Sequence, residues 1–305
     1  MKETPKLAPI LLFVYNRLDS LQQTIENLQA NYLAPQSDLI IFSDGAKTRM
    51  DIDNVQAVRD YINDMTGFKS ISITERKNNY GLAKNIIEGV SEIIKKSKKV
   101  IVLEDDLLTS KNFLCYMNKA LDHYESRKDI FSISGYTADL KSTKQHKYDT
   151  YLSLRVSSWG WATWLDQWEN IDWVVYDFNN FINDKNKVKS FNLAGADMAR
   201  MLRKNREGKN NSWAIRYAYS MFKQKKYCIY PKNSKIKNIG FNSEATHTKN
   251  SNIYKSNFDT KNKRNFIFDD SHKPDENILK EFRKQFSLLN KLIMKTKFLF
   301  LREEI

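Results

Sequence analysis

The 305-residue chain has few of the residues that cross-link a chain or interrupt its helices and strands: two cysteines, five prolines and nine glycines. Cys115 and Cys228 show no metal-ligand spacing and offer no disulfide framework, which suits a reducing compartment. No apolar run is long enough to span a bilayer, and residues 1–5 lack the apolar stretch of a signal peptide. A cytoplasmic protein is therefore expected.

Several binding signatures are also missing. The sequence contains neither Gly-x-Gly-x-x-Gly nor Gly-Lys-Ser/Thr, which argues against a dinucleotide-binding Rossmann fingerprint and against a P-loop. The net charge of +14, from 50 basic and 36 acidic residues, predicts attraction to polyanions such as nucleotide phosphates or anionic lipid head groups. Nucleic acid is not an expected partner, because the basic residues are spread along the chain without a helix-turn-helix or ribonucleoprotein-type motif.

Apolar runs and amphipathic stretches alternate through the first third of the chain. Runs typical of buried strands occur at residues 10–15, 39–42, 71–73 and 100–103. Between them, apolar residues at helical spacing predict helices that carry Leu21, Val55 and Leu82. Strands separated by helix-length segments indicate βαβ units, and hence an α/β fold with a mostly parallel sheet.

The most informative feature is the apolar run 100–103 followed directly by Glu104, Asp105 and Asp106. Three adjacent carboxylates repel one another, so they are tolerated only when solvated or bound to a cation. In open α/β sheets, ligands collect outside the carboxyl ends of the strands. This tripeptide is therefore a candidate site for a divalent metal with a phosphorylated ligand. The alternative interpretation is an ordinary polar turn.

Other strands of the predicted sheet also end in polar residues. Asn16 and Arg17 follow the first strand, Asp44 follows the second, and a helix opens at Gly81. An arginine can clamp a phosphate with two parallel hydrogen bonds, and a helix N-terminus presents free N–H groups to an anion. Asp44 can accept a hydrogen bond from a base N–H. Together these ends predict a ligand crevice.

At this point the chain resembles the GT-A nucleotide-sugar glycosyltransferases, most nearly the N-acetylglucosaminyltransferase I family and its bacterial relatives. The resemblance covers roughly residues 8–250, and its strongest stretch is VIVLEDDLLTSKNFLCYM. APILLFVYNR, LIIFSDG and NNYGLAKNIIEGV precede that stretch in the family's order. DIFSISGYT, RVSSWGWATW, CIYPKNSKIKNIGF and ATHT follow it. An ordered series of this kind is more specific than any single motif.

The resemblance implies a GT-A type fold with a mostly parallel central sheet, flanking helices and a small antiparallel ribbon. It also implies a divalent ion, Mn²⁺ or Mg²⁺, that bridges the two phosphates of the donor. Asp106 matches the acid that binds this metal, and His247 matches a histidine near the diphosphate. The positions that match nucleotide-sugar contacts are Asn16, Arg17, Asp44, Lys84, Asn85, Glu104 and Asp105, with Asp44 as the acid that recognises uracil.

The segment from Ser157 to Trp164 carries three tryptophans in RVSSWGWATW. Sugars present apolar C–H faces that stack on aromatic rings, so Trp159, Gly160 and Trp161 are candidates for binding the acceptor. The competing interpretation is a hydrophobic clamp between the sheet and later helices. The two interpretations are compatible.

The catalytic base is not evident in the sequence. Inverting transfer, the expected outcome, needs a carboxylate near the acceptor hydroxyl. The stretch that matches the family's base, residues 210–216, has no carboxylate. Glu207, Asp197 and Glu244 are the remaining candidates, and the sequence does not choose among them.

The C-terminal part divides in two after an expected glycosyltransferase domain at residues 1–250. Residues 251–275 are polar and predict an exposed linker or lid. Residues 276–305 have apolar residues at helical spacing with lysines between them, which predicts a basic amphipathic helix. Such a helix either makes peripheral contact with the inner face of an anionic membrane or packs back on the domain.

The sequence thus predicts a metal-dependent hexosyl- or N-acetylhexosaminyltransferase. It would move a sugar from a UDP-sugar donor to a saccharide or lipid-linked saccharide acceptor, in bacterial surface polysaccharide or lipooligosaccharide synthesis. A sugar nucleotidyltransferase is one alternative, although residues 15–19 lack the glycine-rich basic loop that it would need after the first strand. The other is a saccharide- or nucleotide-binding protein that has lost catalysis, in keeping with the missing base.

Overall fold

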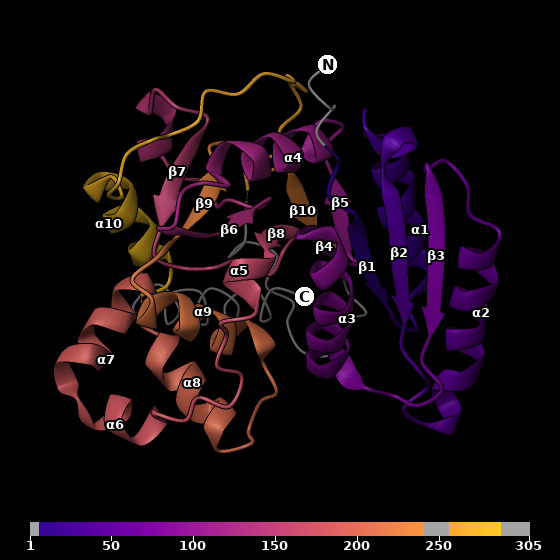
Figure 1. Cartoon of the computed structure of the whole chain (residues 1–305), viewed down its shortest axis with the longest axis horizontal. Helices are drawn as coiled ribbons and strands as arrows, with labels where there is room; N and C mark the ends of the chain where they lie inside the picture. Colours follow the sequence, from indigo (N-terminus) through magenta and orange to yellow (C-terminus); the bar gives the residue numbers. More distant parts are fainter. Residues whose placement is uncertain (1–5, 241–255, 288–305) are drawn as a thin grey trace, which may run out of the picture.

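The computed structural model describes residues 6–240 and 256–287 of the chain. Its centre is an eight-stranded sheet that runs across the whole width of the molecule (Figure 1). In spatial order its strands are β3 (Ser70–Glu75), β2 (Asp38–Ser43), β1 (Ile10–Val14), β4 (Lys99–Glu104), β8 (Trp161–Trp164), β6 (Ile130–Ser134), β9 (Tyr227–Pro231) and β7 (Thr150–Ser153).

The sheet has two halves of different construction. β3, β2, β1 and β4 are all parallel, and the central β1 is buried along its entire length. β8 is antiparallel to both β4 and β6, β9 is parallel to β6, and β7 is antiparallel to β9. The parallel half therefore presents the carboxyl ends of neighbouring strands along one edge, as the sequence predicts.

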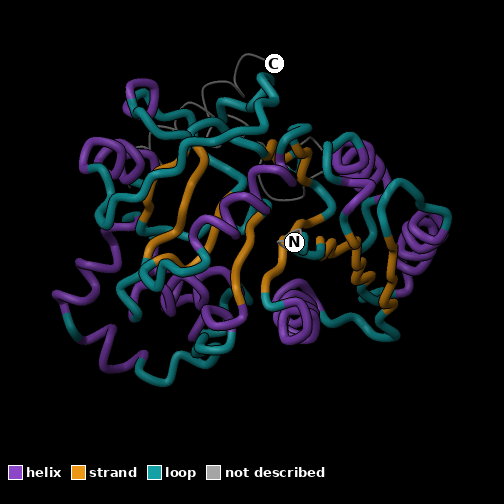
Figure 2. The backbone as a smooth tube through the Cα atoms, turned by 45° about the horizontal axis from the view of Figure 1, so that its top comes forward, coloured by secondary structure: helices purple, strands orange, loops and turns teal. Residues whose placement is uncertain are grey.

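Helices cover both faces of the sheet, as Figure 2 shows. α1 (Leu18–Gln29), α2 (Ile52–Asn63) and α4 (Phe113–Tyr124) lie on one face. α3 (Gly81–Ser97), α5 (Leu165–Trp168) and α9 (Trp213–Lys223) lie on the other, where the Trp168 indole bonds to Ser91 of α3. α6 (Phe178–Asn183), α7 (Lys185–Phe191) and α8 (Met198–Arg206) form a lobe beside α9 (Figure 1). The short 3₁₀ segments are Ala34–Gln36, Arg49–Asp51, Ser142–Gln145 and Asn192–Ala194.

A separate antiparallel ribbon completes the architecture. β5 (Leu107–Thr109) pairs with β10 (Ile236–Asn238), and the Ile239 N–H donates to the carbonyl of Asp106 at 2.9 Å. The ribbon thus brings residues 236–240 against the acidic end of β4. The expected α/β class, with a mostly parallel central sheet, flanking helices and a small antiparallel ribbon, is confirmed.

The polar segment before the C-terminal helix is described from residue 256 onward. It runs along α4 and is anchored to it by hydrogen bonds. The buried Asp259 accepts from Asn112 at 3.0 Å and pairs with the buried Lys235, and the Tyr124 hydroxyl donates to the carbonyl of Asp269 at 2.9 Å. Most residues of this stretch are exposed, as expected, while Asp259 and Asp269 are buried and hydrogen-bonded inside the fold.

Of the predicted C-terminal helix, the structure describes α10 (Glu276–Gln285), and the expected residues after 287 lie outside the described part. Ile278 and Phe282 of α10 are buried against the domain. For this stretch the packed-back alternative holds. Within the described ranges, no helix has the length and apolar character needed to cross a membrane.

Candidate functional site

The carboxyl ends of β1, β2 and β4 meet the N-terminus of α3 around a cavity of about 350 Å³. This is the crevice position expected for an open α/β sheet. Its lining includes five of the seven predicted nucleotide-sugar contacts: Arg17, Asp44, Asn85, Glu104 and Asp105. Strand and helix ends that are far apart in the sequence therefore converge as expected. We call this space the strand-end cavity.

The acidic cluster is paired with Arg17. The Arg17 guanidinium bonds to the Asp105 carboxylate and lies 3.1 Å from Oδ2 of Asp106. Asp105 also accepts from the Tyr15 N–H at 3.3 Å, and its side chain is almost fully buried. The Arg17 side chain, by contrast, is 45% exposed. The partly solvated Arg17 therefore pairs with two of the three carboxylates at the end of β4.

Burial is the main cause that raises the pKa values of Glu104 and Asp105. Desolvation, followed by the charges of Asp106 and Asp105, raises the pKa of Glu104 to about 8. Desolvation also raises the pKa of Asp105 to about 6, against the opposing effect of the Arg17 charge. Arg17 therefore offsets only part of the cost of ionising these buried carboxyl groups, and a further cation would favour their charged forms.

Asp44 has a structural task in addition to its predicted role. Its buried carboxylate accepts from the N–H groups of Gly45, Tyr80 and Gly81 at 2.7 to 2.9 Å. The Asn79 amide donates to the same carboxylate at 3.2 Å, the longest of the four contacts. Asp44 thereby holds the start of α3, since the N–H groups of Tyr80 and Gly81 lie at the N-terminus of the helix, where N–H groups lack helical partners.

Arg76, which the sequence analysis did not name, lies beside Asn85 but is not among the residues that line the strand-end cavity. Its Nε lies 3.3 Å from Oδ1 of Asn85, and its guanidinium stacks over the rings of Tyr80 and Phe42 at 4.9 and 5.2 Å. Among the described residues, its Nη2 is buried without a hydrogen-bond partner. A buried guanidinium nitrogen seeks an acceptor, so Arg76 is available to a ligand beside Asn85. Its place after β3, at the same sheet edge, was the available signal.

Tyr15 and Lys47 also line the strand-end cavity and were not predicted. The Lys47 N–H donates to the Tyr15 hydroxyl at 3.0 Å, which fixes the loop after β2 against the end of β1. Two predicted contacts lie outside the lining. Asn16 donates to Asp51 at 2.9 Å, and the exposed Lys84 sits over the Tyr80 ring at 4.2 Å.

Among the described residues, no cluster of three or more metal-ligating side chains is assembled for an ion. The donor chemistry still suits a hard cation, because Asp106, which does not line the strand-end cavity but pairs with Arg17, offers carboxylate oxygens. Gly240 leaves room for them: a Cβ at that position would lie 2.2 Å from Oδ2 of Asp106. The residues present thus fit an ion that takes one protein carboxylate and most of its ligands from elsewhere.

The remaining predicted residues are dispersed. His247 and Glu244 lie outside the described residues. Asp197 is buried and paired with Arg155, with Oδ1 2.9 Å from Nη1. Glu207 is exposed at the end of α8 and pairs with Lys209 at 2.7 Å. Neither Asp197 nor Glu207 lines the strand-end cavity.

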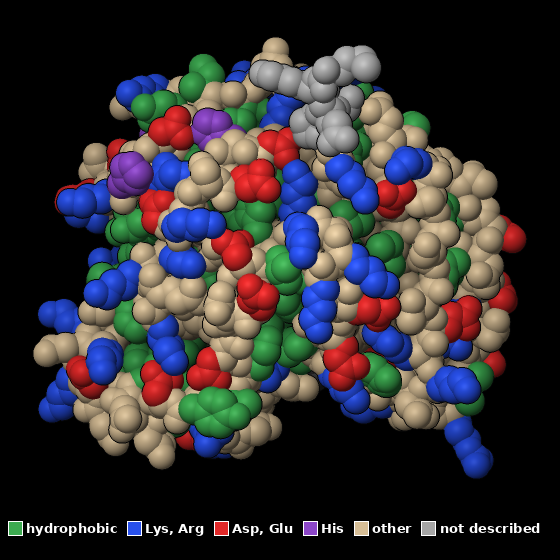
Figure 3. Space-filling view, in the orientation of Figure 1, with side chains coloured by type: hydrophobic (Ala, Val, Ile, Leu, Met, Phe, Trp, Pro, Cys, Tyr) green, Lys and Arg blue, Asp and Glu red, His purple; other side chains and the backbone are tan. Residues whose placement is uncertain are grey.

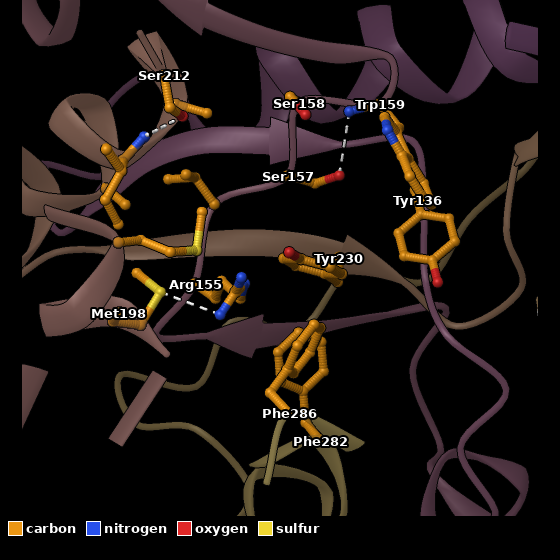
Figure 4. A pocket seen from close by; sticks show the side chains of 15 residues that line it. Tyr136, Arg155, Ser157, Ser158, Trp159, Met198, Ser212, Tyr230, Phe282 and Phe286 are labelled. Carbon is orange, nitrogen blue, oxygen red and sulfur yellow. Dashed lines mark hydrogen bonds between the residues drawn. The ribbon is translucent and has the colours of Figure 1, made fainter. Parts of the chain in front are cut away.

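The tryptophan segment separates into a cavity residue and a core residue. Trp161 is 1% exposed and packs among Trp168, Trp213 and Tyr217, with ring centroids 5.0 to 5.7 Å away. Its expected role as an acceptor platform does not fit this burial, and it belongs to the core. Trp159 remains half-buried and lines a second cavity (Figure 4). Gly160, with φ of +56°, approaches Ile236, whose side chain leaves no space for a Cβ.

Comparison with known structures gives distant similarities. The chain is similar to the mannosyltransferase PcManGT from Pyrobaculum calidifontis, in complex with GDP-Man and Mn²⁺, at 12% identity and a TM-score of 0.38. That alignment covers 54% of this chain and 49% of that one. TarS from S. aureus is similar at 9% identity and a TM-score of 0.44, over 75% of this chain and 36% of TarS. This chain thus spans about half or less of the length of both proteins.

A family comparison is more informative. No curated protein matches the chain. The model of the family described as Glycosyl transferase family 2 matches residues 10–190, which is more than half of the chain and includes β1 to β4 with their polar ends. The match does not confirm the narrower resemblance to N-acetylglucosaminyltransferase I. The chain belongs to Glycosyl transferase family 2.

Proposed function

We propose that the protein is a metal-dependent glycosyltransferase that moves a sugar from a UDP-sugar donor to a saccharide acceptor. The observation that carries the proposal is the acidic end of β4 in the same cavity as Arg17 and the start of α3. A nucleoside diphosphate needs both cations and N–H donors, and this edge of the sheet offers both. Family membership supports transfer chemistry.

The base of the donor would lie toward Asp44, Asn85 and Arg76. A uracil ring presents an N3–H donor and two carbonyl acceptors, which match a carboxylate and a guanidinium. For Asp44 to accept the N3–H, the base would replace the Asn79 amide, whose 3.2 Å contact is the weakest of the four. The unpartnered Nη2 of Arg76 would then serve a carbonyl of the base.

The diphosphate would lie between Arg17 and Asp106. Arg17 is exposed enough to turn from the carboxylates to a phosphate. Asp106 would hold the metal, which when bound would act as a Lewis acid and neutralise the leaving nucleoside diphosphate. Glu104 and Asp105 would contact the donor sugar and ribose. His247 remains a proposed neighbour of the diphosphate by resemblance.

Removal of the proton from the acceptor hydroxyl has no assigned residue. A general base must reach the acceptor hydroxyl, and both described candidates are engaged elsewhere, Asp197 with Arg155 and Glu207 with Lys209. This favours one second candidate function, a donor- or saccharide-binding protein without catalysis. The acceptor's place in bacterial surface polysaccharide or lipooligosaccharide synthesis, at the inner membrane face, is proposed from the resemblance alone.

Calorimetry and a hydrolysis assay test the proposal together. UDP should bind the wild-type chain more tightly with Mn²⁺ than without it, and Asp106→Asn should remove this difference while leaving the fold intact. Release of sugar from a panel of UDP-sugars in the presence of Mn²⁺ would identify an enzyme. Metal-dependent UDP binding without any donor turnover would support the binding protein. Unchanged Mn²⁺ dependence in Asp106→Asn would refute the metal assignment.

A further inference from the structure

A second cavity, of about 280 Å³, lies between the mixed half of the sheet and helices α8, α9 and α10. We call it the aromatic cavity. Figure 4 shows Trp159 beside Tyr136, and Arg155 between Tyr230 and the rings of Phe282 and Phe286. The remaining lining includes Met198, Met201 and the hydroxyls of Ser157, Ser158 and Ser212. None of these residues belongs to the strand-end cavity.

The aromatic cavity adjoins the acidic end of β4. β4 and β8 are antiparallel, and Val102 pairs with Trp161. The residues just before β8, which include Trp159, therefore lie toward Glu104 at the end of β4. The Gly160 carbonyl accepts from the Gly135 N–H at 2.6 Å, which fixes the loops that carry Trp159 and Tyr136. Their rings consequently meet edge to face at 4.7 Å. Trp159 therefore marks the rim where the two cavities approach one another.

The charge in the aromatic cavity is balanced within the protein. The Arg155 guanidinium forms a two-pronged pair with the buried carboxylate of Asp197, at 2.9 and 3.3 Å. It also stacks over the Phe286 ring at 4.1 Å. An ion pair of this geometry presents little net charge to a ligand. The lining thus combines aromatic faces, hydroxyl groups and a neutralised arginine, which suits an uncharged molecule with both C–H faces and hydroxyls.

The outer wall of the aromatic cavity comes from α10. Glu281 accepts from the N–H groups of Lys141 and Ser142 at 2.8 and 2.7 Å, and these bonds anchor the helix to the domain. From this anchor Phe282 packs edge to face on Tyr230, with centroids 5.5 Å apart, and Phe286 packs on Phe282 at 5.2 Å. The described end of the C-terminal region is therefore part of a binding cavity.

We propose that the aromatic cavity is the acceptor subsite and takes one neutral pyranose unit, with α10 as the wall that selects it. The inference rests on the proposed glycosyltransferase function and deepens it, because it names the acceptor as an uncharged saccharide at the position next to the transferred sugar. Trp159 would stack on one face of the ring. Phe286 and Tyr230 would limit the ring's size on the opposite side.

Saturation-transfer NMR on the full chain with UDP and Mn²⁺ tests the proposal. The probes are methyl β-D-glucopyranoside, methyl β-D-galactopyranoside, the corresponding methyl N-acetylglucosaminide, anionic methyl β-D-glucuronide and octyl β-D-glucopyranoside. At least one neutral methyl glycoside should receive saturation through its ring protons, and the glucuronide should bind more weakly. Phe286→Leu keeps an apolar wall but removes the ring, and should weaken binding about two- to ten-fold.

Control measurements distinguish failure of the acceptor subsite from failure of the proposed glycosyltransferase function. Arg283→Ala, on the exposed face of the same helix, should leave glycoside binding unchanged. Trp159→Ala should abolish the ring-proton signal, and Phe286→Leu keeps the test open if that variant unfolds. Calorimetric UDP binding in each variant reports on the strand-end cavity independently. Wild-type UDP binding without glycoside binding would overturn the subsite alone, as would saturation confined to the octyl chain or binding that ignores Phe286→Leu. Absence of UDP binding would instead overturn the proposed function.

Discussion

The two halves of the sheet end in cavities with different linings. In the parallel half, charged side chains gather at strand ends, where Arg17 and the carboxylates of Glu104, Asp105 and Asp106 partly balance one another. In the mixed half, the corresponding edge leads to Trp159 and an aromatic cavity whose one arginine is already paired. The first lining suits a charged ligand, and we propose that the second takes a neutral one. A transferase that joins a nucleotide-sugar to a saccharide needs both.

The surface between these regions carries no such division. Figure 3 shows Lys and Arg side chains spread over one face of the molecule, with Asp and Glu among them. The charged side chains on this face are therefore dispersed, and they do not by themselves locate the site. The strand ends locate the site. Single substitutions in each half of the sheet test the difference between the two cavities.

The largest effect is expected at Trp161. Truncation to alanine removes a fully buried ring from the cluster with Trp168, Trp213 and Tyr217, and should lower the free energy of unfolding by about 3–5 kcal/mol. Urea denaturation measures this loss. Trp159→Ala, two residues away and half-buried, should cost much less stability. If Trp161→Ala were as stable as the wild type but lost glycoside binding, the division between core and cavity would be wrong.

Arg17 gives the next largest effect. Arg17→Ala leaves Asp105 and Asp106 without their partner, so Mn²⁺ should bind the protein more tightly when UDP is absent. The same variant should weaken UDP binding by about 1.5–3 kcal/mol, the usual range for a hydrogen bond to a charged group. Electron paramagnetic resonance of free Mn²⁺ and calorimetry of UDP provide the two measurements. Weaker Mn²⁺ binding in Arg17→Ala, without UDP, would contradict this account, and Arg17→Lys serves as the charge-matched control.

A substitution at Asp44 tests recognition of the nucleotide base. A carboxylate that accepts the uracil N3–H should favour UDP over CDP by roughly 1–3 kcal/mol, because cytosine has no donor there. Asp44→Asn should reduce that preference, and it should also loosen the loop of Tyr80 and Gly81. Competition calorimetry with the two nucleotides reports the preference. Equal affinity for UDP and CDP in the wild type would assign Asp44 to the loop alone.

Gly240 should give the smallest effect. An added Cβ would lie 2.2 Å from Oδ2 of Asp106 and 3.3 Å from Nη1 of Arg17, so the ribbon end or the Asp106 side chain must shift. Gly240→Ala should therefore reduce Mn²⁺-dependent UDP affinity by about 1 kcal/mol, the low end for overpacking. Thermal unfolding should change little. A variant with normal Mn²⁺ dependence would show that the ribbon does not restrict Asp106.

Much of the parallel half was predictable, because its signals are local. Each strand from β1 to β4 is a short run whose apolar pattern shows in consecutive residues, and each polar end follows at once. Arg17, Asp44, Asn85, Glu104 and Asp105 consequently met in one cavity as expected. Arg76 was not predicted, because β3 at the sheet edge is only partly buried and its apolar pattern is weaker than that of the buried strands.

The mixed half could not be derived in the same way, because its contacts join distant residues. β6 pairs with β9 across Ile133 and Ile229, and Arg155 pairs with Asp197 far along the chain. Nothing near Trp159 or Trp161 in the sequence tells which one is covered. Trp168, Trp213 and Tyr217 make that choice for Trp161 only after α5 and α9 pack on the sheet.

By itself, the sequence determined the α/β class, the run of strands with charged ends and the absence of nucleotide-binding glycine motifs. Those properties depend on residues within a few positions of one another. The tertiary structure decided that Arg17 pairs with Asp105 and Asp106, that Asp44 holds the start of α3, and that α10 walls a cavity with Phe282 and Phe286. These features depend on contacts between side chains that are far apart in the sequence. Only the folded chain determines which groups are buried and which charges are paired.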